Sequence, residues 1–277
     1  MVSEEFRSLI RVEGARLYRD LPWRRTRDPY HIWLSEVMLQ QTQVARVETR
    51  MPAWLERFPS VEALAEAPTS DVLEAWQGMG YNRRALALKR AAQEIMERYD
   101  GAFPRETKEL VALPGIGPAT AQGIRAFAFD LPGVYLETNV RTVFLHHFFP
   151  DVPAVPDREL TPLVEATCPL APEGIAARTD GASGAERFAV PQDAEDTPRA
   201  WYYALLDYGA HLKQEVANPS RRSAHHTRQS AFEGSRRQKR AEVLRVVLAE
   251  PGIPLDDAHA RLNAFEAAGG RGSVDRA

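Results

Sequence analysis

The stretch that decides the fold is Leu113-Pro114-Gly115-Ile116-Gly117-Pro118-Ala119-Thr120-Ala121. Its two glycines allow a tight turn with close backbone approach, and Pro118 suits the first turn of a helix. Apolar residues recur every three or four positions at 107–113 and 119–129, which predicts a helix on each side of the turn. The open amides and the dipole of the second helix can hold a phosphate. Taken alone, the pattern also fits any tight turn between helices.

Helical spacing of apolar residues continues through most of the chain, with short Pro, Gly, Asn or Asp clusters between the segments. Further helices are predicted at 61–67, 72–76, 83–99, 201–213, 236–248 and 255–265, and another begins near Asp28-Pro29. Alternating strand patterns are scarce, so the sequence predicts an all-α fold. The segment 171–198 lacks a sustained period and is expected to be a mobile surface insertion, and the tail 269–277 to be frayed.

The composition is that of a folded globular protein, with 44% apolar and 26% charged residues among 277. The single cysteine, Cys168, excludes a disulfide scaffold and fits a reducing compartment. No run of about 18 apolar residues occurs. We therefore expect a soluble cytoplasmic monomer, associated with the nucleoid if the source is bacterial, and no membrane partner.

Charge is unevenly distributed along the chain. Residues 213–245 contain nine Lys or Arg and three Asp or Glu, whereas the whole chain has a formal net charge of −3. A basic segment in an acidic chain is typical of nucleic-acid binding, because contacts with phosphates release counterions. A solvated helical face accounts for the same charge equally well.

The segment 33–44, which reads WLSEVMLQQTQV, carries one carboxylic acid among apolar residues. On a helix, Glu36 shares a face with Ile32 and Leu39, so its pKa is expected to rise. A carboxylic acid that is protonated near neutral pH can serve as a general acid. For an isolated glutamate, helix capping or pairing with an arginine is the more common arrangement.

Four segments together resemble the adenine DNA glycosylases (MutY) of the helix-hairpin-helix superfamily, which includes endonuclease III. They are 33–44, Gly78-Met79-Gly80-Tyr81, the hairpin 113–121 and Glu137-Thr138-Asn139-Val140-Arg141, in family order and with family-like spacing. The resemblance covers roughly residues 10–230. It implies a two-lobed helix-hairpin-helix DNA glycosylase fold with the active site in the cleft between the lobes. The implied parts are a six-helix-type bundle at 26–135, a second lobe at 1–25 and 136–230, and a basic helical extension at 231–277.

The resemblance implies a role for each matching residue. Glu36 matches the acid that protonates the adenine ring, Asn139 matches a residue near the sugar, and Glu137 stands where the family has an aspartate that stabilises or captures the sugar cation. The base pocket is matched by Trp23, Arg24, Leu39 and Asp207. The residues expected to meet DNA are Gln41, Tyr81, Gly115, Gly117, Ala119, Thr120, Arg221, Arg222, Arg236 and Arg237. Core packing is the alternative for the pocket residues, and an acid that interacts with a helix dipole is the alternative for Glu137.

The chain departs from the family pattern at three places. Glu137 is one methylene longer than the family's aspartate, which leaves electrostatic stabilisation available and covalent capture open. Ala119 replaces the Schiff-base lysine of endonuclease III, so we expect a monofunctional glycosylase. The four iron–sulfur cysteines are replaced by Lys213, Ser220, Ser223 and Gln229. We therefore expect no cluster and no other cofactor or metal, and a loop fixed by polar side chains and arginines.

The sequence thus predicts a base excision repair enzyme that hydrolyses the N-glycosidic bond of a mispaired base in double-stranded DNA. Adenine opposite 8-oxoguanine or G is the first expectation. Family members recognise 8-oxoguanine largely with a bigger C-terminal domain, which we expect to be missing because only 231–277 follow Ser230. Two alternatives stay open: a glycosylase for T or U opposite G or for hypoxanthine, and a non-catalytic DNA-structure-binding protein.

Overall fold

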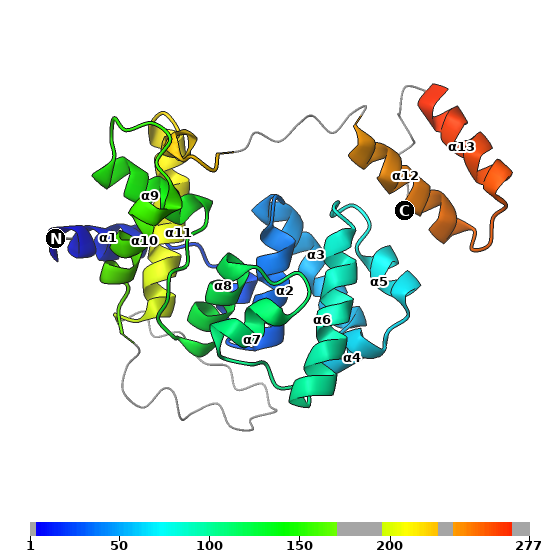
Figure 1. The fold of residues 1–277 in the computed structure, drawn as a ribbon, viewed down its shortest axis with the longest axis horizontal. Helices are drawn as coiled ribbons and strands as arrows, with labels where there is room; N and C mark the ends of the chain where they lie inside the picture. Colours follow the sequence, from blue (N-terminus) through cyan, green and yellow to red (C-terminus); the bar gives the residue numbers. More distant parts are fainter. Residues whose placement is uncertain (1–3, 171–195, 227–234, 268–277) are drawn as a thin grey trace. The chain divides into compact units, whose positions relative to one another are not determined.

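The computed structural model describes residues 4–170, 196–226 and 235–267, which form helices joined by turns with no β-strand among them (Figure 1). The all-α prediction is confirmed. Residues 171–195 of the predicted insertion, Gln229 and the tail 269–277 lie outside the described ranges. Within those ranges, no helix combines the length and the apolar character that a bilayer crossing requires.

The chain divides into two compact units. The first comprises Met1–Pro52 with Ala102–Thr227, and the second comprises Ala53–Gly101 with Arg228–Ala277. The lobes inferred from the resemblance, 26–135 and 1–25 with 136–230, stay a prediction.

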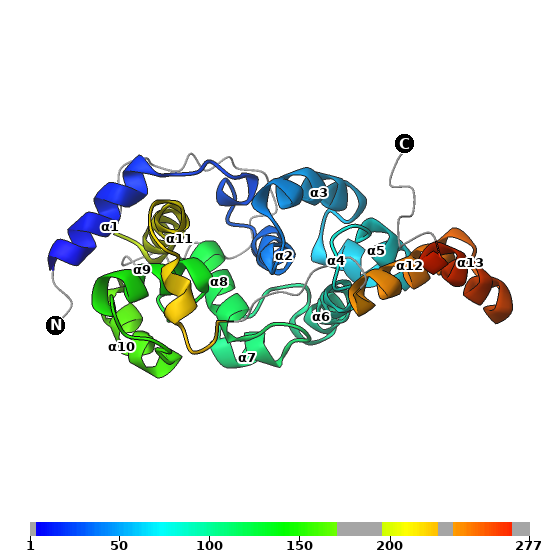
Figure 2. The same ribbon diagram turned by 90° about the horizontal axis from the view of Figure 1, so that it is seen from above.

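The first unit is arranged around one long helix. Its helices are α1 (Glu4–Arg16), α2 (Pro29–Leu39), the first part of α3 (Val44–Arg57), α7 (Thr107–Ala112), α8 (Pro118–Phe129), α9 (Thr138–Phe148), α10 (Asp157–Thr167) and α11 (Pro198–Glu215), with 3-10 turns η1 (Pro22–Arg24) and η3 (Pro219–Arg222). Helix α11 lies between α1 and α9, and α2 packs along α8 (Figure 2). Ile10, Phe144 and Tyr202 are each 0% exposed. The burial of these apolar side chains on three helices stabilises the unit.

The hairpin has the form that the sequence predicted. Helix α7 ends at Ala112 and α8 begins at Pro118, and Gly115 between them has φ 77°, a left-handed conformation that favours glycine. Leu113 and Ile116 are 2% and 3% exposed, so the turn is fastened to the core by its apolar side chains. The glycines and the start of α8 consequently face solvent.

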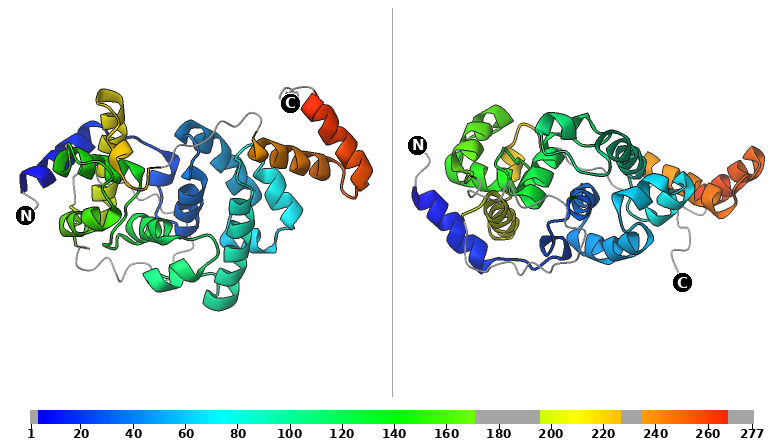
Figure 3. Two further views of the ribbon diagram at one scale, coloured as in Figure 1. Left: turned by 45° about the horizontal axis from the view of Figure 1, so that its top comes forward. Right: turned by 90° about the horizontal axis from the view of Figure 1, so that it is seen from below.

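The second unit contains the remaining helices. They are α4 (Val61–Glu66), α5 (Thr69–Ala75), α6 (Arg83–Tyr99), α12 (Arg236–Ala249) and α13 (Leu255–Ala267). Helices α4 and α5 pack against α6, and α12 packs against α13 (Figure 3). Trp54 contacts Phe58 and Trp76 edge-on, with ring centroids 5.0 and 5.4 Å apart. These aromatic rings form the apolar centre of the unit.

Candidate active site

Glu36 lies in α2 among buried apolar residues. Asp28 begins this helix, because its carboxylate accepts a hydrogen bond of 2.8 Å from the Tyr30 amide. The neighbours of Glu36 on the helix, Trp33 and Val37, are 1% and 5% exposed. Its carboxylate accepts a hydrogen bond of 3.0 Å from the Tyr135 hydroxyl. The apolar setting predicted for this acid is therefore present.

Helix α8 approaches the Glu36 carboxyl at Gly123. A Cβ atom at position 123 would lie 2.8 Å from Glu36 Cδ, which is too close, and 3.0 Å from Tyr135 Cε2, which is a tight contact. Glycine inside a helix costs about 1 kcal/mol relative to alanine. Glycine at this position lets α8 pack closely against the carboxyl group of Glu36.

Burial raises the pKa of Glu36 to about 8. The Tyr135 hydrogen bond opposes this shift, because it favours the ionised form, and the nearby charge of Glu137 adds to it. Glu36 therefore holds a proton near neutral pH. This is the protonation state that a general acid needs before the reaction.

Glu137 is the N-cap of α9. Its Oε1 accepts hydrogen bonds from the amides of Asn139 and Val140. Burial raises the pKa of Glu137, whereas the charge of Lys213 and the bonds from the α9 amides lower it. The helix-terminal interaction considered for this residue is thus present, and the same carboxylate also acts electrostatically on Glu36. The two acids and Asn139 gather at one place.

Lys213, in the last turn of α11, completes this group. Its Nζ donates a hydrogen bond of 2.6 Å to Oδ1 of Asn139. Helix α11 comes close to the first turn of α9 at Gly209, where a Cβ atom would lie 2.7 Å from the carbonyl carbon of Asn139. The site therefore joins residues from α2, α9 and α11 with Tyr135 from the segment before α9.

The residues predicted for the base pocket are mostly engaged in core contacts. Arg24 and Asp207 are 2% and 3% exposed and form two hydrogen bonds, 2.6 and 2.8 Å long. The Arg24 guanidinium also lies 4.3 Å from the centre of the Tyr203 ring. Trp23 is 4% exposed, and Leu39, the last residue of α2, is half-buried. Their contact with a base stays a prediction.

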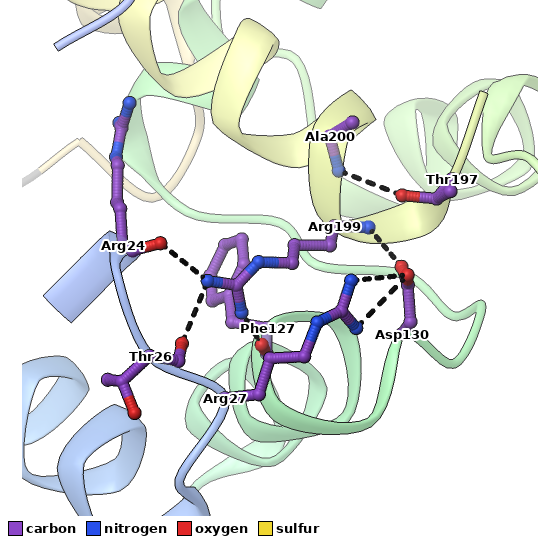
Figure 4. A network of polar contacts seen from close by, with 8 residues as sticks. All are labelled: Arg24, Thr26, Arg27, Phe127, Asp130, Thr197, Arg199 and Ala200. Carbon is purple, nitrogen blue, oxygen red and sulfur yellow. Dashed lines mark hydrogen bonds and ion pairs between the residues drawn. The ribbon is translucent and has the colours of Figure 1, made fainter. Parts of the chain in front are cut away.

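A polar network fixes the segment that leads into α2 (Figure 4). Asp130, at the end of α8, accepts hydrogen bonds from the Arg199 amide at 2.8 Å and from the Arg27 guanidinium at 3.3 Å. The Arg199 guanidinium donates to the carbonyls of Phe127, Arg24 and Thr26. The network thereby ties the start of α11 to the end of α8 and to the chain before Glu36.

The hairpin and the loop after α2 adjoin in the first unit. Gly115, Gly117 and Ala119 are exposed, and Thr120 accepts a hydrogen bond of 3.2 Å from Gln40 Nε2. Gln41 follows at φ 56° with its side chain exposed. These residues, predicted to meet DNA, are accessible apart from Thr120, which is 7% exposed.

Tyr81, in the second unit, is held in a left-handed turn with φ 50°. Trp76 Nε1 donates to the Gly80 carbonyl at 2.9 Å, and the Arg84 guanidinium lies 5.5 Å from the centre of the Tyr81 ring. Arg237 of α12 donates a hydrogen bond of 2.9 Å to the Tyr81 hydroxyl. Tyr81, which the resemblance leads us to expect at the DNA, is therefore held by contacts within its own unit.

The loop after α11 is fixed by hydrogen bonds of its own. The Val155 amide donates to the Arg222 carbonyl at 2.8 Å, and the Ala224 amide donates to the Val155 carbonyl at 2.9 Å. The Arg222 side chain donates to the Leu145 carbonyl of α9 at 2.9 Å. Of the basic residues predicted to meet phosphates, Arg221 and Arg236 are exposed, and Arg222 and Arg237 are half-buried.

The family's iron–sulfur cluster does not fit the residues that stand at its ligand positions. Lys213 offers an ammonium that is bonded to Asn139, and Ser220 and Ser223 offer buried hydroxyls rather than thiolates. The fourth position, Gln229, is outside the described residues. In the ranges that the structure describes, no three His, Cys, Asp or Glu side chains are grouped as metal ligands.

Three residues of the site were not singled out as site residues from the sequence: Tyr135, Gly123 and the inward-facing Lys213. A glycine in the middle of an apolar helical segment, as at 123, is a signal of close approach. Gly209 and Lys213 are four residues apart on one helix, so they share a face. No local signal identifies Tyr135, because Glu36 is 99 positions away.

The chain is similar in sequence to known DNA repair proteins. Residues 34–162 match the model of the HhH-GPD superfamily base excision DNA repair protein. The chain is 45% identical to the adenine DNA glycosylase of Mycolicibacterium smegmatis over 139 residues, 49% of this chain and 47% of that protein. It is 39% identical to the adenine DNA glycosylase of Homo sapiens over 134 residues, 45% of this chain and 24% of that protein. The chain thus spans less than half the length of these relatives.

Solved structures share the fold. A thermostable thymine-DNA glycosylase aligns with a TM-score of 0.56 and 22% identity, covering 75% of this chain and 87% of that chain. A trapped endonuclease III–DNA covalent intermediate aligns with a TM-score of 0.53 and 18% identity, covering 84% of this chain and 92% of that chain. At these identities, the likeness concerns the fold.

Proposed function

We propose that this chain, which matches the HhH-GPD superfamily model over residues 34–162 and is similar to adenine DNA glycosylases, is a monofunctional DNA N-glycosylase of base excision repair. The proposed substrate is a mispaired adenine in double-stranded DNA. The observation that carries the proposal is the pair of coupled carboxyl groups. Glu36 holds a proton near neutral pH, and Glu137 lies close enough to raise its pKa.

The proposed reaction uses the two carboxyl groups differently. Glu36 gives its proton to the adenine ring, so the bond between the base and C1′ breaks with its electron pair leaving on a neutral base. The sugar is left with oxocarbenium character, and the Glu137 carboxylate stabilises this positive charge. Water adds to C1′ and loses a proton, which completes the hydrolysis and leaves an abasic site.

The absence of a lyase step is part of the proposal. Ala119, exposed at the start of α8, carries a methyl group where endonuclease III has its amine. An alanine cannot form a Schiff base with the abasic sugar. The strand is therefore expected to stay intact until alkali is added.

Recognition of DNA is proposed for both units. The hairpin in the first unit places exposed residues at the start of α8, and the beginning of a helix is a favourable place for phosphate binding. Tyr81 in the second unit is proposed to enter the base stack, as extrusion of the target nucleotide requires. Exposed arginines such as Arg236 supply charge for the phosphate backbone.

The deciding experiment is single-turnover base release followed by alkaline cleavage. The labelled duplexes contain A:8-oxoG, A:G, T:G, U:G and hypoxanthine:T pairs. Adenine is expected to be released, and Glu36→Gln is expected to slow this by about 100-fold or more, since general acids contribute on that scale. Glu109→Gln, which alters an exposed glutamate of α7, is the matched control and should behave like the native chain.

The other outcomes separate the alternatives. Release of thymine, uracil or hypoxanthine without adenine would keep the mechanism and change the substrate. Binding to all five duplexes without release, unchanged in Glu36→Gln, would indicate a non-catalytic DNA-structure-binding protein. Strand cleavage before alkali would contradict the monofunctional assignment.

A further inference from the structure

The ammonium group of Lys213 is directed into the candidate active site. Its Nζ donates to Oδ1 of Asn139 at 2.6 Å, and the side chain is half-buried. Family resemblance puts an iron–sulfur cysteine at this position, so Lys213 is a departure of this chain. If Lys213 only bound phosphate, its side chain would be expected to point to solvent and not to Asn139.

The direction of Lys213 is set by the way α11 packs. Gly209, one turn earlier on the same face, lets the backbone of α11 approach Asn139 so closely that a Cβ atom would lie 2.7 Å from the Asn139 carbonyl carbon. Four residues later, that face delivers Lys213 to the start of α9. The contact is therefore built into the helix packing of the first unit.

The hydrogen bond fixes which way the Asn139 amide points. An ammonium has only donors, so it must meet the amide oxygen and not the nitrogen. Nδ2 of Asn139 is then the group left to donate a hydrogen bond at the site. Lys213 thus makes Asn139 a donor of defined orientation.

Lys213 and Glu137 also interact through their charges: burial lowers the pKa of Lys213, and the charge of Glu137 opposes that shift. Glu137 is faced by Glu36 from α2, by Tyr135 from the segment before α9, by Lys213 from α11 and by the first amides of its own helix. Burial raises the pKa of Glu137, and the charge of Lys213 is the largest influence that lowers it. An ionised carboxylate in such a place needs a counter-charge.

We propose that Lys213 is a positioning residue of this site, which orients Asn139 and supplies the positive charge that keeps Glu137 ionised while Glu36 stays protonated. The proposal rests on the proposed function for its kinetic consequence. Base release needs protonated Glu36 and ionised Glu137, so its rate is highest between the pH values at which the two groups titrate. Because Lys213 lowers the pKa of Glu137, it extends the pH range of fast base release toward acidic pH.

The kinetic test compares Lys213→Met with Lys213→Arg across a pH series of single-turnover base release. Without Lys213, the acidic limb of the pH–rate profile should move to higher pH. At a pH on that limb, Lys213→Met is expected to release base about tenfold more slowly for each pH unit of the move. The basic limb, which Glu36 sets, should stay in place, and the arginine variant should restore the acidic limb. A uniform loss at every pH, without rescue by arginine, would show a merely structural role and overturn the proposal.

A second readout does not depend on activity. The pKa of Glu137 in the folded chain lies above its ordinary value, so stability is lost as pH rises from the ordinary value through the folded one. Removing Lys213 should raise the folded pKa of Glu137 further and so extend to higher pH the interval over which stability is lost. Lys213→Met should therefore lower the urea midpoint more at alkaline than at acidic pH. In a Glu137→Gln background, this extra pH dependence should vanish.

The two readouts separate failure of the proposal from failure of the function. If no base is released from any duplex but the unfolding cycle shows the coupling, the glycosylase assignment fails and the charge pairing of Lys213 stands. If base is released and the cycle shows no coupling between Lys213 and Glu137, the positioning role is wrong.

Discussion

Glu36 and Glu137 share the same ordinary pKa of 4.5 and differ in what surrounds them. Glu36 meets apolar side chains and one neutral donor, the Tyr135 hydroxyl, so burial dominates. Glu137 meets an ammonium charge and the amides of α9, which oppose its burial. Because the charge of Glu137 raises the pKa of Glu36, the pair disfavours a state in which both carboxyl groups are ionised.

Tyr135→Phe tests this arrangement through pH. The rate is expected to fall as pH rises through the pKa of Glu36, about 8. The Tyr135 hydrogen bond lowers that pKa, so its removal should raise it and move the basic limb to higher pH. A hydrogen bond of ~1 kcal/mol predicts a move of somewhat less than one pH unit, which corresponds to ~1.4 kcal/mol. A pH series of single-turnover base release measures it, with Tyr99→Phe as control.

Residues of the site differ in how far the sequence predicts them. The apolar setting of Glu36 follows from neighbours three and four positions away on one helix, and the prediction is confirmed. For Glu137, the sequence left two roles as alternatives, an acid at a helix terminus and a carboxylate of the site. In the structure, the same carboxylate caps α9 and interacts electrostatically with Glu36. For Lys213, the sequence indicates only a basic residue at a replaced cluster position. Its contact with Asn139 was not predicted, because the two residues are 74 positions apart and periodicity cannot connect them.

Arg199 connects three segments of the first unit. It is 6% exposed, and its guanidinium donates to carbonyls of η1, of the turn before α2 and of α8 (Figure 4). A planar group with five donors suits this task, and a lysine does not. The segment that starts α2 and the helix that carries Gly123 therefore keep a fixed relation around Glu36.

Arg199→Met is expected to destabilise the protein by about 3 kcal/mol or more, since it leaves buried carbonyls without donors and each bond from a charged donor contributes about 1.5–3 kcal/mol. Urea unfolding at constant pH measures the loss. The matched control is Arg25→Met, which removes an exposed ion pair of 2.6 Å with Asp20 and should destabilise the protein far less than Arg199→Met. Equal losses in both variants would refute the role assigned to Arg199.

Because the cluster cysteines are replaced in the loop after α11, we predict that the protein needs no iron. The bridge between Val155 and Ser223 and the bond from Arg222 to α9 are protein contacts that hold the loop. The purified chain is expected to contain no stoichiometric iron by elemental analysis, and a chelator should leave both its Tm and its base release unchanged. Iron bound in stoichiometric amount, or a Tm that falls on chelation, would contradict this.

The sequence predicts many of the helices in the whole molecule, but it does not single out α1, α3, α9 or α10, and it predicts the grouping of helices less directly. Helix α6 occupies the predicted 83–99, because its apolar period is long and its ends are punctuated. The grouping of α2 and α8 with α11 in one unit depends on contacts such as those of Arg199, which join distant segments. Local patterns specify each helix, and only packing specifies its partners.

The net charge of −3 gives no affinity for DNA by itself, so binding must come from local positive groups. Arg236 and Arg240 are exposed one turn apart on α12 and are expected to meet phosphates. Each phosphate contact contributes about 0.9 to the slope of log affinity against log salt, so Arg236→Gln with Arg240→Gln should reduce the slope by about 2. Fluorescence anisotropy on one duplex over a salt series measures this.

Two other exposed arginines provide the comparison for α12. Arg98 and Arg158 pair with Glu94 and Glu159 at 3.2 and 3.6 Å, so their charge is partly balanced within the protein. Neutralising both changes the net charge by the same amount as the α12 pair and should leave the slope unaltered. Because net charge is matched, an equal effect of the two double variants would assign the salt dependence to the overall field of the protein and not to phosphate contacts of α12.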